Sequence, residues 1–208
     1  MTAAPDEDWS DYYATQVGRP PRPLLLTALN HWHDHDPVNL HAIDLGCGDG
    51  TETLTLLRSG WAVLAIDAQP AAIATLHQLI DPDLQPRLTT LVADFTSLTL
   101  PAADLIYCGW SLPHCGRDHF EQLWGTLRSA LRPRGRFAGQ LLGANDDWAT
   151  GTAAAFTRTD IDRLLENLHV ELLNEVEEDR TSYDGPKHWH YFTVIAQQPE
   201  HPPVKPNT

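Results

Sequence analysis

A run of acidic and glycine residues is the part of the sequence best suited to bind a ligand. It reads Asp44-Leu45-Gly46-Cys47-Gly48-Asp49-Gly50 and follows an apolar stretch that predicts a strand. Glycine has no Cβ, so its backbone can adopt positive φ angles and lie bare against a ligand. The next segment, from Thr51 to Leu57, predicts a helix whose first N–H groups point at the same place. Together these features predict a nucleotide-type binding site.

The spacing of the glycines narrows the choice of ligand. The dinucleotide fingerprint is G-x-G-x-x-G, in which the third glycine packs the helix on the strand. Thr51 occupies that third position here, and the glycines fall as G-x-G-x-G after Asp44. This pattern resembles the first motif of class I S-adenosylmethionine-dependent methyltransferases, E/D-x-G-x-G-x-G. A tight turn without a ligand is the alternative interpretation, and the acidic residues downstream argue against it.

Acidic residues also end the second and third predicted strands. Asp67 closes the apolar run 62–67, 23 residues after Asp44, and Asp94 follows the run 88–93. Ligands of open α/β sheets bind at the carboxyl ends of the strands, where a carboxylate can accept both hydroxyls of a ribose. The resemblance implies that Asp67 binds the cofactor ribose. The alternative is a turn-forming aspartate before Pro70.

The resemblance also implies the rest of a cofactor site. Asp94 would accept the exocyclic amine of the adenine while Phe95 stacks on the ring; the alternative is again a strand-end turn. The implied cofactor-binding set is Asp44, Gly46, Cys47, Gly48, Asp67, Ala68, Gln69, Asp94, Phe95, Cys108 and Gly109.

The segment after the fourth predicted strand would line the reaction centre in this family. Trp110 and Leu112 would face the substrate, although core packing is an equal alternative for Trp110. His114 would act as general base or substrate ligand, or would simply begin the next helix. Methyl transfer from a sulfonium is an in-line displacement that needs alignment and only sometimes a base. A soft nucleophile such as a thiolate or selenide needs no proton removed.

Both ends of the chain resemble small bacterial methyltransferases of the tellurite-resistance type. The tail carries Glu177-Glu178-Asp179-Arg180 and Lys187-His188-Trp189-His190-Tyr191-Phe192, and the N-terminal part carries Tyr12, Tyr13 and Arg19. Tyr12, Tyr13 and Arg19 could close over the pocket and exclude water. We expect Tyr13 and Arg180 to join His114 as catalytic residues, and Tyr12, Arg19 and His188 to join Trp110 and Leu112 in binding the substrate.

Simpler roles remain open for several residues of the tail. Arg180 would hold an oxyanion or pair with Glu177 or Glu178. His188 and His190 point to one face of a strand and could bind a metal, but no ligand partner stands at a recognised spacing. We therefore expect no metal there.

The elements that position these residues alternate between strands and helices. Strands are expected at 40–44, 62–67, 88–93, 103–108, 136–142, 170–179 and 188–197, and helices at 9–16, 24–32, 70–80, 117–131 and from Thr159 or Asp160 onward. This order predicts an α/β Rossmann-like doubly wound sheet, mostly parallel, with an antiparallel C-terminal edge strand and an N-terminal helical cover. The expected organisation is a tail and lid at 1–21, one domain at 22–198 and a disordered tail at 199–208.

Composition limits the partners and the compartment. The formal net charge of −14 repels phosphate backbones, so nucleic acids and anionic membranes are not expected partners. Three cysteines without a C-x-x-C pair fit a reducing cytosol. No apolar run is long enough for a membrane span, and the first residues lack the features of a signal peptide. These features predict a cytoplasmic protein.

Three functions compete on these observations. The first is a methyltransferase that uses S-adenosylmethionine on a small molecule, including a chalcogen or metalloid oxyanion or a thiol. The second is an NAD(P)-dependent oxidoreductase. It is disfavoured because Thr51 stands where the dinucleotide fingerprint has its third glycine. The third is a non-catalytic S-adenosylmethionine-binding protein, which the three acidic positions disfavour. The acceptor and the oligomeric state are not encoded in any recognisable motif.

Overall fold

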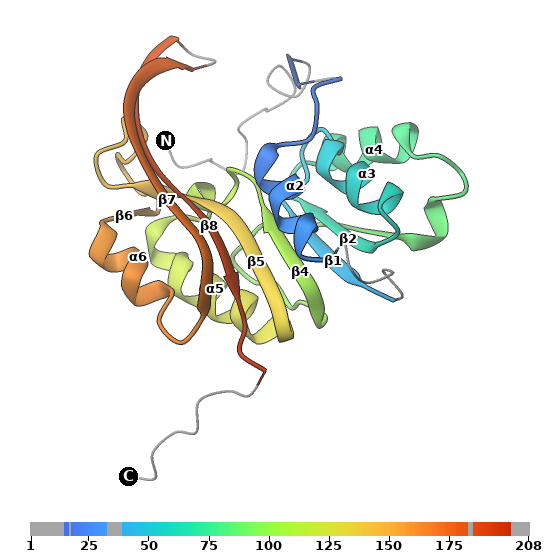
Figure 1. Cartoon of the computed structure of the whole chain (residues 1–208). Coiled ribbons are helices and arrows are strands. Elements are labelled where there is room, and N and C mark those ends of the chain that lie inside the picture. The colour runs from blue at the N-terminus through green and yellow to red at the C-terminus, as the bar shows by residue number, and fades with distance from the viewer. Residues whose placement is uncertain (1–14, 17, 33–38, 183–184, 201–208) are drawn as a thin grey trace.

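A twisted sheet runs through the part of the protein that the structure describes. The structure is a computed structural model, and it describes residues 15–16, 18–32, 39–182 and 185–200. The eight strands in these ranges run in the order β3-β2-β1-β4-β5-β8-β7, with the short β6 paired to β5 (Figure 1). Their bounds are β1 His41–Leu45, β2 Ala62–Asp67, β3 Leu88–Val92, β4 Ala103–Cys108, β5 Leu131–Gly143, β6 Ala155–Phe156, β7 His169–Ser182 and β8 Gly185–Gln197.

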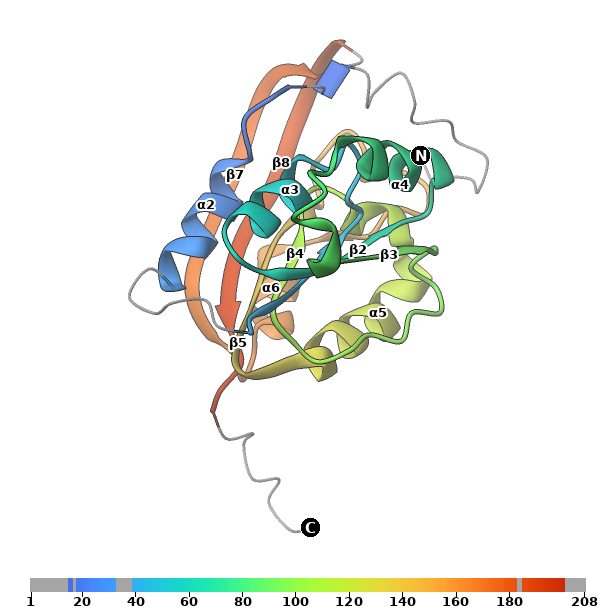
Figure 2. The same cartoon turned by 90° about the vertical axis from the view of Figure 1, so that its right-hand side faces the viewer.

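Helices cover both faces of this sheet. From α2 onward, the α-helices of the described residues are α2 Pro23–Leu29, α3 Thr51–Arg58, α4 Pro70–Leu79, α5 Arg117–Ala130 and α6 Arg158–Leu164. Short 3₁₀ turns lie at Asn30–Trp32, Gln85–Arg87 and Leu112–Cys115. Helices α2, α3 and α4 lie on one face, and α5 and α6 lie on the other (Figures 1 and 2). We call the first face the α2 face.

The predicted fold class is confirmed. Strands β1 to β5 pair in parallel, and the antiparallel pairing lies at the C-terminal side of the sheet. The strand that runs against the others is β8, which lies between β5 and β7.

Several predicted boundaries were wrong. Strand β5 begins at Leu131 rather than at residue 136, because Arg134 adopts a positive φ of 64° and the strand continues through that irregularity. Helix α6 begins after Thr157, whose hydroxyl and the Asp160 carboxylate form a capping box. The predicted helix 9–16 and both terminal tails fall mostly outside the described residues.

The last two strands form a hairpin that is longer than the rest of the sheet. Strand β5 pairs with β8 only as far as Tyr191, whereas β7 and β8 stay paired up to Ser182 and Gly185. The outer half of this hairpin therefore extends beyond the carboxyl edge of the sheet (Figure 1). It carries the residues of the tail that the sequence had singled out.

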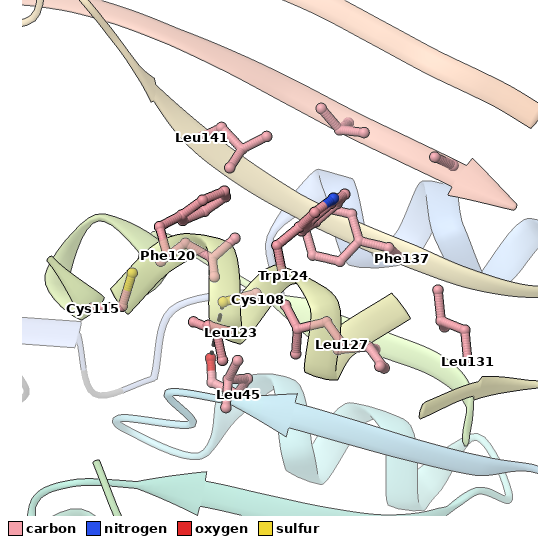
Figure 3. Close-up of a cluster of buried hydrophobic side chains, with 14 of the residues drawn as sticks. Leu45, Cys108, Cys115, Phe120, Leu123, Trp124, Leu127, Leu131, Phe137 and Leu141 are labelled. Atoms are coloured by element: carbon pink, nitrogen blue, oxygen red, sulfur yellow. Dashed lines mark hydrogen bonds between the residues drawn. The ribbon is translucent and has the colours of Figure 1, made fainter. Parts of the chain in front are cut away.

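The largest apolar core lies between the sheet and α5. Phe120, Trp124 and Leu127 of α5 pack against Phe137 and Leu141 of β5 (Figure 3). Successive residues of a strand point to opposite faces, so the odd-numbered core positions of β5 face α5 and the even-numbered ones face α2. This alternation decides which side chains near the carboxyl edge can meet.

Candidate functional site

The glycine turn after β1 has the geometry that its sequence predicts. Gly46, Gly48 and Gly50 have φ values of 77°, 49° and 80°. A Cβ on Gly46 would lie 2.3 Å from the Cβ of Ser111. A side chain at this position would therefore displace the loop after β4, so the turn needs glycine for conformation and for space.

Asp67 is held at the mouth of this turn by backbone groups. The Gly48 N–H donates to its Oδ2 at 2.9 Å and the Gln69 N–H donates to its Oδ1 at 2.9 Å. The side chain is 5% exposed. Each carboxylate oxygen can accept more than one hydrogen bond, so this fixed carboxylate can still receive hydroxyls from a ligand. Ala68 is exposed and Gln69 half-buried beside it.

Asp94 and Phe95 lie beside the same turn. The Asp94 Oδ1 accepts hydrogen bonds from the Thr96 N–H at 2.9 Å and from the Thr96 hydroxyl at 2.6 Å, and these bonds lower the pKa of the carboxyl. The Phe95 ring approaches within 3.6 Å of the position that a Gly46 Cβ would take. The loop after β3 thus contributes a charged group and an apolar wall next to the glycine turn.

Asp44 is a buried carboxyl under the turn. It is 1% exposed and its Oδ2 accepts a 2.6 Å hydrogen bond from the Thr53 hydroxyl. Burial, with a further contribution from the Glu52 charge, raises the pKa of Asp44 to about 7. Cys47 is buried beside it, and burial raises the pKa of its thiol. Neither side chain is exposed to bulk solvent.

Arg19 ties the segment before α2 to the start of α3. Its guanidinium donates to Glu52 Oε1 at 2.7 Å and to Asp49 Oδ1 at 2.9 Å, and the Arg22 N–H donates to the same Glu52 oxygen at 3.0 Å. Burial disfavours the charge of Arg19, but the hydrogen bonds and charges of Glu52 and Asp49 outweigh it and raise its pKa. The predicted substrate ligand is therefore a clamp between two segments.

The Cys108 side chain is locked into the core. Its thiol donates to the Leu45 carbonyl at 3.4 Å (Figure 3). The thiol also lies 2.8 Å from the Ser111 hydroxyl, which itself donates to the Leu45 carbonyl. Burial raises the pKa of this thiol to about 12. Only the backbone of Cys108 and Gly109 is therefore suited to lie along a ligand.

Trp110 begins an aromatic cluster that joins the loop after β4 to the hairpin. It adopts a positive φ of 67°, and its ring lies 4.8 Å from Tyr191 and 5.4 Å from Trp189 between centroids. Trp148 meets Trp189 at 5.3 Å. We call Trp110, Trp148, Trp189 and Tyr191 the aromatic cluster.

The next two predicted residues, Leu112 and His114, lie in the 3₁₀ turn Leu112–Cys115. The Leu112 side chain is 1% exposed and packs in the α5 core rather than toward the aromatic cluster. His114 lies in the 3₁₀ turn before α5, and burial lowers the pKa of its imidazole to about 4. The imidazole is therefore neutral near pH 7 and has a free-base form, as a proton acceptor requires.

A buried ion pair anchors the hairpin to the loop after β5. Lys187 Nζ contacts the Asp146 carboxylate, and both side chains are at most 3% exposed. The ammonium lies 3.8 Å from the Trp189 ring centroid and 4.3 Å from that of Trp148. Asp146 also accepts the His190 N–H at 2.9 Å. The loop and β8 are therefore joined by a charge in an aromatic box.

His188 and Arg180 lie outside this box. His188 pairs with Asp179 at 2.8 Å and Glu177 at 3.3 Å, and these carboxylates raise the pKa of the imidazole. Strand alternation places His188 on the face opposite Trp189. Arg180 is more than half exposed, 3.4 Å from Glu178 and 5.5 Å from the Trp189 ring.

The structure thus brings the predicted cofactor residues together and separates the predicted substrate residues. Tyr12 and Tyr13 lie outside the described residues. The sequence reasoning missed Glu52, Asp146, Tyr107 and Gln140, each of which is buried and polar near the carboxyl edge. The signal that could have found Gln140 is its polar type within the apolar β5 run.

The described residues contain neither a membrane-spanning helix nor a cluster of metal ligands. None of the helices in these ranges combines the length and apolar character needed to cross a bilayer. Within the same ranges, no three or more His, Cys, Asp or Glu side chains are grouped so as to hold a metal ion.

Comparisons with known proteins agree with this geometry. The methyltransferase domain family matches residues 42–135. The chain is 32% identical over 97 residues to the mitochondrial ubiquinone biosynthesis O-methyltransferase of Schizosaccharomyces pombe. That match covers 45% of this chain and 35% of the relative, so the chain spans about a third of that protein.

Solved structures share the fold over most of the chain. TehB from Haemophilus influenzae superposes with a TM-score of 0.73 at 15% identity, covering 90% of this chain and 66% of that one. The 1,6-didemethyltoxoflavin-N1-methyltransferase of Burkholderia thailandensis superposes with a TM-score of 0.63 at 21% identity, covering 91% and 84%. At these identities the likeness concerns the fold.

Proposed function

We propose that this chain, which carries a methyltransferase domain and belongs to the class I S-adenosylmethionine-dependent methyltransferases, transfers a methyl group to a small molecule. The observation that carries the proposal is the Asp67 carboxylate, fixed by two backbone N–H groups beside a turn of left-handed glycines. S-adenosylmethionine supplies an electrophilic methyl group on a sulfonium when it is bound.

The residues at the carboxyl edge fit this cofactor. Asp67 offers lone pairs for ribose hydroxyls, and Ala68, Gln69, Asp94 and Phe95 surround the place for an adenine. Asp44, Gly46, Cys47 and Gly48 would hold the amino-acid end, the first through its carboxyl and the glycines through bare backbone. The backbone of Cys108 and Gly109 would lie along the sulfonium.

The protein's part in the reaction is then mainly alignment. An in-line displacement needs the acceptor atom held at a fixed distance and angle, which the loop after β4 and the hairpin supply from two sides. Trp110 forms the wall between them, and its aromatic contacts exclude water.

A proton acceptor is needed only for oxygen or nitrogen acceptors. His114 is our proposed base because it follows the strand end that would face the transferred methyl group. Burial keeps its imidazole neutral near pH 7 and at the same time makes it a weaker base than a free histidine. The catalytic roles of Tyr13 and Arg180 remain predictions. We consider Arg180 a weaker candidate than His114 because it is ion-paired with Glu178. A chalcogen or thiol acceptor would use none of the three as a base.

Calorimetric titration with S-adenosylmethionine, S-adenosylhomocysteine and NAD tests the proposal. We expect heat with the first two and none with NAD. Asp67→Ala should weaken the binding of S-adenosylhomocysteine at least about tenfold, because charged hydrogen bonds to the ribose are lost. The exposed Asp83→Ala is the matched control and should bind like the wild type.

Binding of NAD alone would contradict the proposal and favour an oxidoreductase. Binding of S-adenosylmethionine without turnover on any acceptor would favour a non-catalytic binding protein. Turnover is best followed as S-adenosylhomocysteine formed with tellurite, selenite, thiols, small acids and hydroxylated rings.

A further inference from the structure

Buried polar atoms without a hydrogen-bond partner gather on one face of the sheet. Within the described ranges, five side-chain atoms are buried and unpartnered, and four belong to the α2 face: Arg19 Nε, Tyr107 Oη, Gln140 Oε1 and Trp189 Nε1. Tyr107 and Gln140 are 1% and 6% exposed. A buried polar atom without a partner costs about 1–3 kcal/mol, so such a group indicates a missing partner.

Strand register brings Tyr107 and Gln140 to neighbouring positions. Tyr107 pairs with Ala138 in the parallel β4–β5 ladder, and Gln140 is two residues further along β5 on the same face. The Tyr107 hydroxyl lies only 2.9 Å from the position that a Cβ of Gly109 would take. It therefore points along the strand toward the carboxyl edge, where the methyl group would be transferred.

The aromatic cluster borders the same place. Tyr191 pairs with Leu142 in the β5–β8 ladder, which sets it next to the Gln140–Thr193 pair on the α2 face. Trp110 packs on Tyr191, and its positive φ is backbone strain of the kind that persists at binding sites. Trp110 and Tyr191 therefore border the same part of the α2 face as Tyr107 and Gln140.

The surrounding charges disfavour an anion. Asp44 and Glu52 are buried at 1% and 4% exposure on this face, and both raise the pKa of Tyr107 in addition to the effect of burial. Arg22 and Arg19 act on Tyr107 in the opposite direction but more weakly than the two carboxyls, and Arg19 is already paired with Glu52 and Asp49. A second negative charge here would be repelled at close range.

We propose that Tyr107 and Gln140 are specificity-determining residues that bind the polar edge of the methyl acceptor, and that this acceptor is an uncharged planar ring carrying a donor beside an acceptor. The inference rests on the function proposed above. Gln140 Oε1 accepts a hydrogen bond from the ligand N–H or O–H, and the Tyr107 hydroxyl donates to the adjacent ligand oxygen. Trp110 and Tyr191 contact the ring.

The test measures binding by calorimetry in the presence of saturating S-adenosylhomocysteine. The probes are 2-quinolinone and salicylamide, which are neutral rings with a donor next to a carbonyl. Quinoline-2-carboxylate has a similar ring with a negative charge, and tellurite and selenite are anions without a ring. We expect the two neutral probes to bind and the three anions to bind at least tenfold more weakly.

Variants assign the binding to the two residues. Tyr107→Phe removes one hydroxyl, and Gln140→Met removes the carboxamide at similar volume. Each should weaken 2-quinolinone about five- to tenfold and leave the affinity for S-adenosylhomocysteine unchanged. Gln122→Met, the same substitution at an exposed position of α5, is the matched control and should bind both like the wild type.

The outcomes separate this inference from the function on which it rests. Failure of the wild type to bind S-adenosylhomocysteine overturns both. Cofactor binding with tighter binding of tellurite, selenite or the quinoline carboxylate, or with no binding of either neutral probe, overturns the inference alone. A loss of cofactor affinity in Tyr107→Phe or Gln140→Met, with 2-quinolinone unaffected, also overturns it.

Discussion

At the scale of single residues, the site depends on carboxylates held in different environments. Asp67 is 5% exposed and fixed by backbone donors, Asp94 is exposed and held by Thr96, and Asp44 is 1% exposed under the turn. Burial raises the pKa of Asp44 to about 7, whereas hydrogen bonds from Thr96 lower that of Asp94. These two carboxyls therefore respond to pH in different ways.

The Asp44 carboxyl makes stability depend on pH. Its folded-state pKa of about 7 lies above its ordinary value of 3.8, so the folded protein binds this proton more tightly than the unfolded chain. The stabilising contribution is full below the unfolded pKa and is lost as the pH rises through 7. Asp44→Asn cannot ionise and can still accept the Thr53 hydrogen bond.

We compare the free energy of unfolding of Asp44→Asn with that of the wild type. We expect this difference to shift in favour of the variant by about 2 kcal/mol when the pH is raised from about 5 to about 8. Urea unfolding at both values measures the change, and the exposed Asp83→Asn should show no such trend. If the variant and the wild type differ in free energy of unfolding by the same amount at both pH values, Asp44 is ionised in the folded protein over this whole range.

Some of these residues were within reach of the sequence and others were not. Asp67 and Asp94 could be found because parallel strands end at one edge, and a residue at a strand end needs no partner to be located. The Arg19 pair with Glu52 spans 33 positions, and the contact between Lys187 and Asp146 spans 41. Periodicity says nothing about such pairs, so the sequence does not reveal that Arg19 joins two segments.

At the scale of elements, a buried charge joins the outer half of the hairpin to the loop after β5. Lys187 sits between Trp148 and Trp189 and contacts Asp146, while Asp146 also binds the backbone of β8 and of its own loop. The period-2 pattern of β8 places Lys187 on the same face as Trp189, but polarity alone predicted neither its burial nor its partner.

Removing this ammonium should be costly. Lys187→Met leaves the Asp146 carboxylate buried without its counter-charge, and we expect a loss of about 3–5 kcal/mol in the free energy of unfolding. Urea unfolding measures it, with Arg163→Met in the exposed pair with Asp160 as control, where we expect a change below about 0.5 kcal/mol. Equally small losses of stability in both variants would show that the ammonium of Lys187 between Trp148 and Trp189 is not needed for stability.

At the scale of the whole molecule, the acidic surface opposes the compact state. The formal net charge is −14, and many ion pairs are on the surface, where each contributes little. Self-repulsion of like charges is then the larger long-range effect, and salt screens it over about 10 Å at 0.1 M.

We expect the melting temperature to rise by about 2–5 °C when NaCl is increased from about 20 mM to about 300 mM. Calorimetry at constant pH measures the change, and sodium sulfate at matched ionic strength separates screening from salting-out. A fall in the melting temperature would mean that the surface ion pairs outweigh the repulsion.

The position of β8 between β5 and β7 has a consequence for synthesis. While the nascent chain emerges from the ribosome, β5 is complete long before its neighbour at Gly185–Gln197 has been translated. The backbone N–H and C=O groups along that side of β5 stay unpaired in the interval. Strand β7 cannot pair with them because its place in the sheet is beside β8, one strand further out. A stop codon after Ser182 would leave that interval permanent, and the released fragment should be captured by chaperones or aggregate.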